Sequence, residues 1–181
     1  MRKINIALII GVLLVVVFLI IAFLFLILGK PKYEKQDLLN PLGSGNLSNF
    51  VVEESHVKYL LNEIGAYQLH AQPMSSENPL IEVVVDDSVF FAEVERGIIL
   101  FRSEKTYEPD IRIITTKQEV KSVLSSGNIK ESMKNSVSGG NTQMELVSGY
   151  TELFFKGYLQ IYKDLTGKSF TGSVVRIFGQ G

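Results

Sequence analysis

Residues 80–101 read LIEVVVDDSVFFAEVERGIILF, and apolar side chains recur at every second position along three short runs. This period of two is typical of strands with one face in a core. The alternating residues are Ile81, Val83, Val85, Phe90, Ala92, Val94, Ile99 and Phe101. Asp86-Asp87 and Arg96-Gly97 are turn signals between the runs. Turns this short join antiparallel strands, because parallel neighbours need a crossover of about a dozen residues, so the segment predicts an antiparallel meander.

Two further strands are expected on the C-terminal side of the meander. The fourth begins after Glu108-Pro109-Asp110, and the fifth covers Gln143 to Val147. Two short helices separate them, one from the capping-box pattern at Thr116 to Gly127 and one from Asn128 to Gly139. The domain is therefore expected to be of the α+β class, with a mainly antiparallel five-stranded sheet covered by helices.

Amphipathic helices are expected on both sides of this region, over residues 53–64 and Thr151 to Leu165. On a helical wheel, one arc of the second helix is apolar and rich in aromatic residues, while Glu152, Lys156, Gln160, Lys163 and Asp164 fill the solvated arc. Glu152 and Lys156 also have the spacing of a helical ion pair. Two interpretations stay open: core packing alone, or a helix that also borders a ligand cavity or a membrane. The alternation in residues 169–181 predicts an edge strand.

The N-terminal segment Ile6 to Leu28 contains no charged or polar side chain. A helix of this length would measure roughly 34 Å, which suffices for a hydrocarbon core of about 30 Å. A cleaved signal peptide would have an apolar stretch of about 7–15 residues followed by small residues, and no such site follows here. The segment is therefore interpreted as a transmembrane anchor.

The expected domain organisation is an anchor at residues 1–29, a flexible tether at 30–49 and one domain at 50–181. Basic residues flank the anchor on both sides, so the positive-inside rule does not decide its orientation. The short N-terminal tail favours a single-pass protein whose domain is extracytoplasmic, and the opposite orientation stays open. Asn46-Leu47-Ser48 is a glycosylation sequon that has meaning only in the first case.

The composition argues against several classes of function. The chain carries 18 basic and 19 acidic residues, so it lacks the basic excess of a nucleic-acid-binding protein. It contains no cysteine, and His56 and His70 do not have metal-ligand spacing. Gly139-Gly140 lacks the Lys-Ser/Thr of a phosphate loop. We therefore expect no catalytic residue, no metal, no cofactor and no enzymatic activity.

Four short motifs resemble the sterol carrier protein type-2 family. They are Arg96-Gly97-Ile98-Ile99-Leu100, Pro109-Asp110-Ile111-Arg112-Ile113, the helix from Glu119 to Gly127, and Ser138-Gly139 before a strand. The resemblance covers about Ser55 to Gly167. The chain departs from the family because it has no Trp, no peroxisomal C-terminal tripeptide and an added anchor, so transport between organelles is not implied.

The resemblance implies a domain that binds lipids or fatty acyl chains, without catalysis, in an apolar tunnel between sheet and helices. The wall of that tunnel would be formed by Phe90, Phe101, Val120, Leu124, Met133, Phe154, Tyr158 and Tyr162. The predicted function is therefore membrane-anchored binding of a lipid or another apolar ligand, with the bilayer contacted through Ile6 to Leu28.

The alternative is a membrane-anchored interaction module, in which a fully packed α+β domain presents a surface to a protein that the sequence does not identify. Cavity volume separates the two functions. A continuous apolar cavity of about 300 Å³ or more behind the last helix favours ligand binding, whereas close packing there favours the interaction module.

Overall fold

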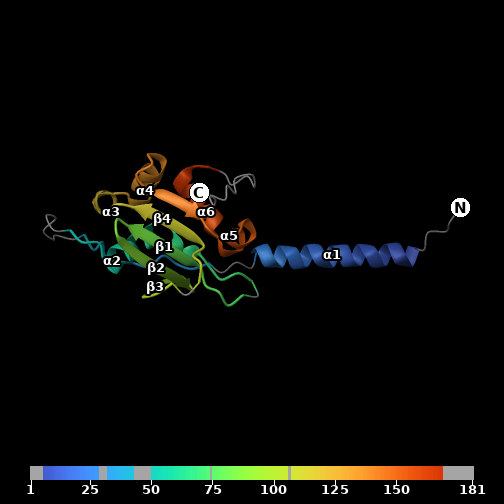
Figure 1. Ribbon diagram of the computed structural model, residues 1–181. Coiled ribbons are helices and arrows are strands. Elements are labelled where there is room, and N and C mark those ends of the chain that lie inside the picture. The colour runs from blue at the N-terminus through green and yellow to red at the C-terminus, as the bar shows by residue number, and fades with distance from the viewer. Residues whose placement is uncertain (1–5, 29–31, 43–49, 74, 106, 169–181) are drawn as a thin grey trace, which may run out of the picture. The chain divides into compact units, whose positions relative to one another are not determined.

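The structure is a computed structural model, which describes residues 6–28, 32–42, 50–73, 75–105 and 107–168 (Figure 1). The chain divides into two compact units, Met1–Lys32 and Tyr33–Gly181. In chain order the elements are α1 (Ile6–Leu28), α2 (Glu54–Glu63), the 3-10 helix η2 (Ala66–Gln68), β1 (Leu80–Val85), β2 (Ser88–Glu95), β3 (Ile98–Arg102), β4 (Ile111–Thr115), α3 (Lys117–Leu124), α4 (Ile129–Ser138), β5 (Gln143–Leu146), α5 (Tyr150–Lys156) and α6 (Tyr158–Thr166). The expected edge strand within residues 169–181 lies outside the described residues.

Helix α1 belongs to the first unit, and its bounds are those of the predicted anchor. Within the described part of the chain, however, no helix is both long and apolar enough to cross a membrane. The prediction of a transmembrane anchor at Ile6–Leu28 is therefore wrong. The predicted single-pass, extracytoplasmic localisation, which depends on that anchor, is wrong with it.

The sheet lies in the second unit, and its strand order is β3-β2-β1-β4-β5. The predicted hairpins β1–β2 and β2–β3 are antiparallel, as is the pair β4–β5. The prediction of a mainly antiparallel sheet is nevertheless wrong, because β4 pairs in parallel with β1, placing Ile111 beside Ile81 and Ile113 beside Val83. The sheet is therefore mixed. Residues 86–110, which include the β2–β3 hairpin, supply the long crossover that a parallel pair requires.

One face of the sheet is apolar and is covered by helices. Ile81 and Val83 of β1 and Ile111 and Ile113 of β4 pack with buried side chains from α2, α3, α4 and α6 into one core. The opposite face is polar along its centre, where Arg112 of β4 bridges Glu82 and Glu145 at 3.1 Å each. Glu82 is buried, but Arg112 and Glu145 are partly open to solvent, which weakens both pairs, so the apolar face contributes most to the stability of the fold.

The helices begin where the sequence provides caps. The hydroxyl of Thr116 accepts a hydrogen bond from the backbone of Glu119 at the start of α3, and Asn128 caps α4 in the same way. Helix α2 begins with a capping box in which the backbone N–H of Glu53 donates to Nδ1 of His56. His56 therefore has a structural role in the fold.

The single helix expected over Thr151 to Leu165 is two helices in the structure. Gly157 adopts φ = +92°, a left-handed conformation that ends α5 and starts α6 in a new direction. A wheel drawn through all fifteen residues therefore misplaces side chains near the break. The most important of these is Lys156, which the wheel assigned to the solvated arc and which is buried.

Candidate functional site

An apolar void lies between the covered face of the sheet and α2, α3 and α4. Its lining is apolar apart from Thr115, and consists of Val57, Leu60, Val83, Ile113, Thr115, Val120, Val123 and Met133. Two of the eight predicted wall residues, Val120 and Met133, take part in it. The void measures about 10 Å³, close to the room that a single water needs. The void is therefore closely packed, far below 300 Å³, and is lined by no residue of the last helices, α5 and α6.

Three other predicted wall residues belong to the same core but do not line this void. Leu124, at the end of α3, is buried. Phe90 of β2 and Phe101 of β3 are half-buried and pack against the core. Their rings meet edge to face with centroids 6.4 Å apart. This pair closes the β2–β3 side of the covered face.

The three predicted wall residues of the last helices lie apart from the void. Phe154 stacks on Tyr150 with ring centroids 6.3 Å apart and meets Phe155 edge to face. Tyr162 of α6 is half-buried. Tyr158 is fully buried, and its hydroxyl donates to Asp110 at 2.9 Å. The structure therefore does not bring the eight predicted residues together into one wall.

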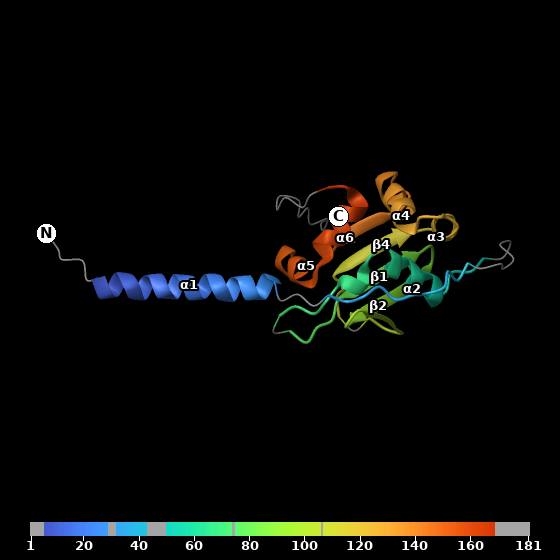
Figure 2. The same ribbon diagram turned by 180° about the vertical axis from the view of Figure 1, so that it is seen from behind.

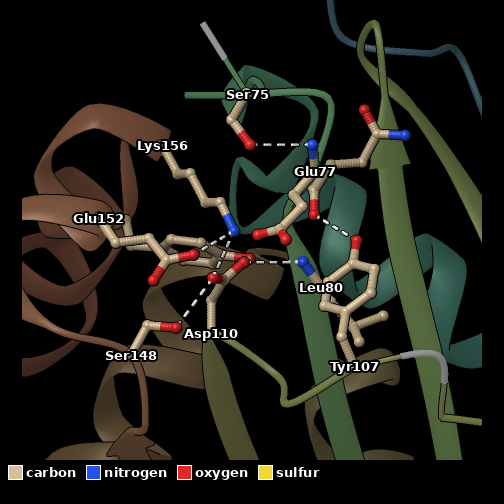
Figure 3. A network of polar contacts seen from close by, with 10 residues as sticks. Ser75, Glu77, Leu80, Tyr107, Asp110, Ser148, Glu152 and Lys156 are labelled. Carbon is tan, nitrogen blue, oxygen red and sulfur yellow. Dashed lines mark hydrogen bonds and ion pairs between the residues drawn. The ribbon is translucent and has the colours of Figure 1, made fainter. Parts of the chain in front are cut away.

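A buried polar network lies where the strands β1 and β4 begin (Figure 3). Its centre is Asp110, immediately before β4, with 1% of its surface exposed. Oδ1 accepts hydrogen bonds from Nζ of Lys156 at 2.7 Å and from the hydroxyl of Ser148 at 3.1 Å. Oδ2 accepts from the backbone N–H of Leu80 at 2.8 Å and from Tyr158. Four donors thus converge on one carboxylate.

Lys156 at the end of α5 supplies the positive charge of the network. Its ammonium group is 2.7 Å from Asp110 and 2.6 Å from Glu152, and the side chain is 1% exposed. The predicted ion pair with Glu152 is confirmed. Burial acts to lower the pKa of Lys156, but the hydrogen bonds that its ammonium group donates to Asp110 and Glu152 outweigh burial and raise the pKa above 10.5. The lysine is therefore held in its charged form.

This network is suited to hold elements of the fold together. A nucleophilic or basic lysine needs a lowered pKa, and the pKa of Lys156 is raised. Every buried side-chain nitrogen and oxygen that the structure describes has a hydrogen-bond partner. Among the described residues there is also no cluster of three or more histidine, aspartate or glutamate side chains that suits a metal ion.

Sequence reasoning found the position of Asp110 but not its partners. Asp110 appears in the motif that precedes the fourth strand, and an acidic residue directly before an apolar strand was the available signal. Two signals could have shown that Lys156 is buried. Gly157 directly after the lysine ends the helix, and Leu153, three residues before the lysine, lies on the same, buried face.

Comparisons with known proteins add a distant likeness. No protein-family model matches the sequence, and no curated protein matches it. A solved structure titled UbiJ-SCP2 Ubiquinone synthesis protein is similar over 60% of this chain and 79% of its own, with 7% sequence identity and a TM-score of 0.32. A TM-score this low supports no conclusion about fold or function. The fold is therefore described from the elements and contacts given above.

Proposed function

We propose that the α+β domain binds an apolar ligand, a lipid or a fatty acyl chain, without catalysis, between the sheet and helices α2, α3 and α4. The observation that carries this proposal is the void itself, which is apolar and lies in the layer where the family resemblance puts a ligand. Val120 and Met133 are the two predicted wall residues that border it. The order of elements on which the resemblance rests is a helix, four strands, two short helices, a fifth strand and one long helix, and the structure has this order except that Gly157 divides the last helix.

The ligand must open the void, because 10 Å³ does not admit an acyl chain. The helices that would move are α3 and α4, which have 8 and 10 residues. Gly127 lies between them, and Gly139 and Gly140 follow α4. Glycines at the ends of these helices can act as hinges that absorb changes in φ and ψ. Ligand binding then selects an open form that is a minor population of the free protein.

The energetics of an apolar ligand match a site without charges. Burying one CH₂ group contributes about 0.8 kcal/mol, so a chain of about 16 carbons gains enough to offset the loss of helix contacts without an ion pair. An ionised head group would have to stay at the surface, because the lining offers no counter-charge.

The second candidate is the interaction module, and the specific observation in its favour is the close packing of the void. In that case the domain does not open, and its function lies in a surface presented to a protein partner.

The test is mass spectrometry of the full-length chain, both native and after organic extraction, followed by titration with a fluorescent fatty acid. The informative variant is Val120→Phe, whose ring is larger than the void and so blocks it, and its matched control is Val147→Phe at an exposed valine after β5. We expect a lipid adduct that weakens in Val120→Phe and persists in Val147→Phe. A chain that carries no lipid and ignores the fatty acid, or an adduct equally strong in both variants, would refute the proposal and leave the interaction module.

A further inference from the structure

An extended segment, residues 33–42, lies against helices α2 and α3, and we term it the strap (Figure 2). At its start, Tyr33 packs so closely on Gly97 of the β2–β3 turn that a Cβ on Gly97 would be 2.6 Å from the Cβ of Tyr33. Lys35 then pairs with Glu63 of α2 at 2.7 Å. At its end, Leu42 packs against the core. The strap is therefore fixed at both ends.

The strap is bound to α2 by a buried asparagine. Asn62 has no exposed surface, and its amide makes two hydrogen bonds to the backbone of Gln36. The N–H of Gln36 donates to Oδ1 of Asn62 at 3.3 Å, and Nδ2 of Asn62 donates to the carbonyl of Gln36 at 2.9 Å. A buried amide used in this way specifies one position of the strap along α2.

The strap is bound to α3 by a second asparagine. Nδ2 of Asn40 donates to the carbonyl oxygen of Leu124 at 2.9 Å. Leu124 is the last residue of α3, where backbone carbonyls lack partners within the helix. The strap thus provides a hydrogen-bond donor to one backbone carbonyl at the C-terminal end of α3.

Both of these helices line the apolar void. Helix α2 contributes Val57 and Leu60, and α3 contributes Val120 and Val123. We propose that the strap is a latch that holds α2 and α3 together and so controls access to the void, an inference that rests on the proposed function. Separation of the helices requires the Asn40–Leu124 or the Asn62–Gln36 contact to break, because one short chain segment joins both.

The test uses the absence of cysteine from the chain, which makes any introduced cysteine a unique reporter. Val123→Cys is placed in the full-length protein, and the rate at which a maleimide labels it is measured without ligand. This rate follows the population of the open form. We expect Asn40→Ala to raise it about fivefold, the change expected from losing one ordinary hydrogen bond. Asn62→Ala is expected to raise it further.

Two controls separate latch release from general loss of stability. Asn135→Ala removes an exposed asparagine from α4 and should leave the rate unchanged. Val94→Cys reports on a buried valine of β2 outside the void, and its labelling should respond less to Asn40→Ala than that of Val123→Cys. Asn40 is itself exposed, so its variant is expected to fold even where Asn62→Ala does not.

An unchanged Val123→Cys rate in Asn40→Ala, or an equal rise at both reporters, would overturn the latch. The outcome for the proposed function is read separately. If labelling rises selectively but no variant binds the fluorescent fatty acid, the strap holds the helices and the ligand proposal fails. If the fatty acid binds in wild type but not in Val120→Phe, and labelling of Val123→Cys is unchanged in Asn40→Ala, the ligand proposal stands and the latch fails.

Discussion

The ammonium group of Lys156 lies between the carboxylates of Asp110 and Glu152, and its charge is the one cation in this buried network. Lys156→Met leaves the Asp110 carboxylate buried without a counter-charge, and we expect the free energy of unfolding to fall by about 3–5 kcal/mol. The double variant Asp110→Asn, Lys156→Met should lose less than the sum of the single losses, because neither residue is then charged. Urea denaturation of the four proteins measures this coupling.

The matched control for that cycle is Lys130→Met. Lys130 pairs with Asp164 at 2.7 Å, but both side chains are open to solvent, so we expect a loss of about 0–1 kcal/mol. Equal losses for Lys130→Met and Lys156→Met would contradict the assignment of Lys156 as a buried structural charge.

The same network predicts how stability changes in alkali. The pKa of Lys156 is raised above 10.5, that of Tyr158 is raised well above 10 by burial and by the Asp110 charge, and burial raises that of Tyr107 to about 12. From about pH 10 upward the folded protein therefore keeps protons that the unfolded chain loses, so the free energy of unfolding falls as pH rises. Each such group contributes a slope of about 1.4 kcal/mol per pH unit.

Urea titrations between about pH 8 and pH 11.5 measure this slope. Tyr158→Phe should make it shallower. At neutral pH the variant should also be less stable, because Asp110 loses a donor. The change of stability in acid is less informative. Burial raises the pKa of Asp110, whereas the hydrogen bond from Lys156 lowers that of Glu152, so the two carboxyls change the free energy of unfolding in opposite directions as the pH falls. A flat alkaline limb in the wild-type chain would refute the prediction.

The β2–β3 turn depends on a glycine for two separate reasons. Gly97 has φ = +82°, and its missing Cβ makes room for Tyr33 of the strap. Gly65 has φ = +98° but has open space around it. Alanine at Gly65 therefore introduces only backbone strain, about 1 kcal/mol, whereas alanine at Gly97 adds a steric clash. Thermal unfolding should show a larger loss for Gly97→Ala, and equal losses would mean that Tyr33 moves away freely.

Local patterns predicted the elements better than their partners. Alternation from Ile81 to Phe101, the caps at Thr116 and Asn128, and the two turns gave three strands and two helices at nearly the observed positions. The neighbour of β4 could not be read in this way, because pairing with β1 spans 30 residues and is decided by packing of the whole sheet. The split at Gly157 was missed because the wheel assumed one continuous helix.

The predicted wall residues show the same limit. Six of the eight belong to the core or pack against it, but only Val120 and Met133 border the void, Phe90 and Phe101 form a separate pair, and Phe154 stacks on Tyr150. Periodicity identifies which side of a helix is buried, whereas the space between two elements depends on side chains from both. The resemblance names a layer of the fold, and only the side chains of both elements decide how much space that layer contains.

A closed void held by a latch links ligand affinity to the stability of the free protein. If the open form is a minor population, the apparent affinity is the intrinsic affinity multiplied by that population. Asn40→Ala should therefore lower the stability of the free chain by about 1 kcal/mol, since a hydrogen bond is lost, and raise the apparent affinity for a fatty acid by about fivefold.

Thermal melts of the full-length chain with and without the fluorescent fatty acid measure both effects at once. At one ligand concentration the variant should start from a lower midpoint and gain a larger upward shift than the wild type, because stabilisation grows with the ratio of ligand concentration to dissociation constant. Val120→Phe, whose ring blocks the void, should abolish the shift in both backgrounds. An equal shift in wild type and Asn40→Ala would show that the ligand binds without opening the strap. Binding would then not require α2 and α3 to move apart.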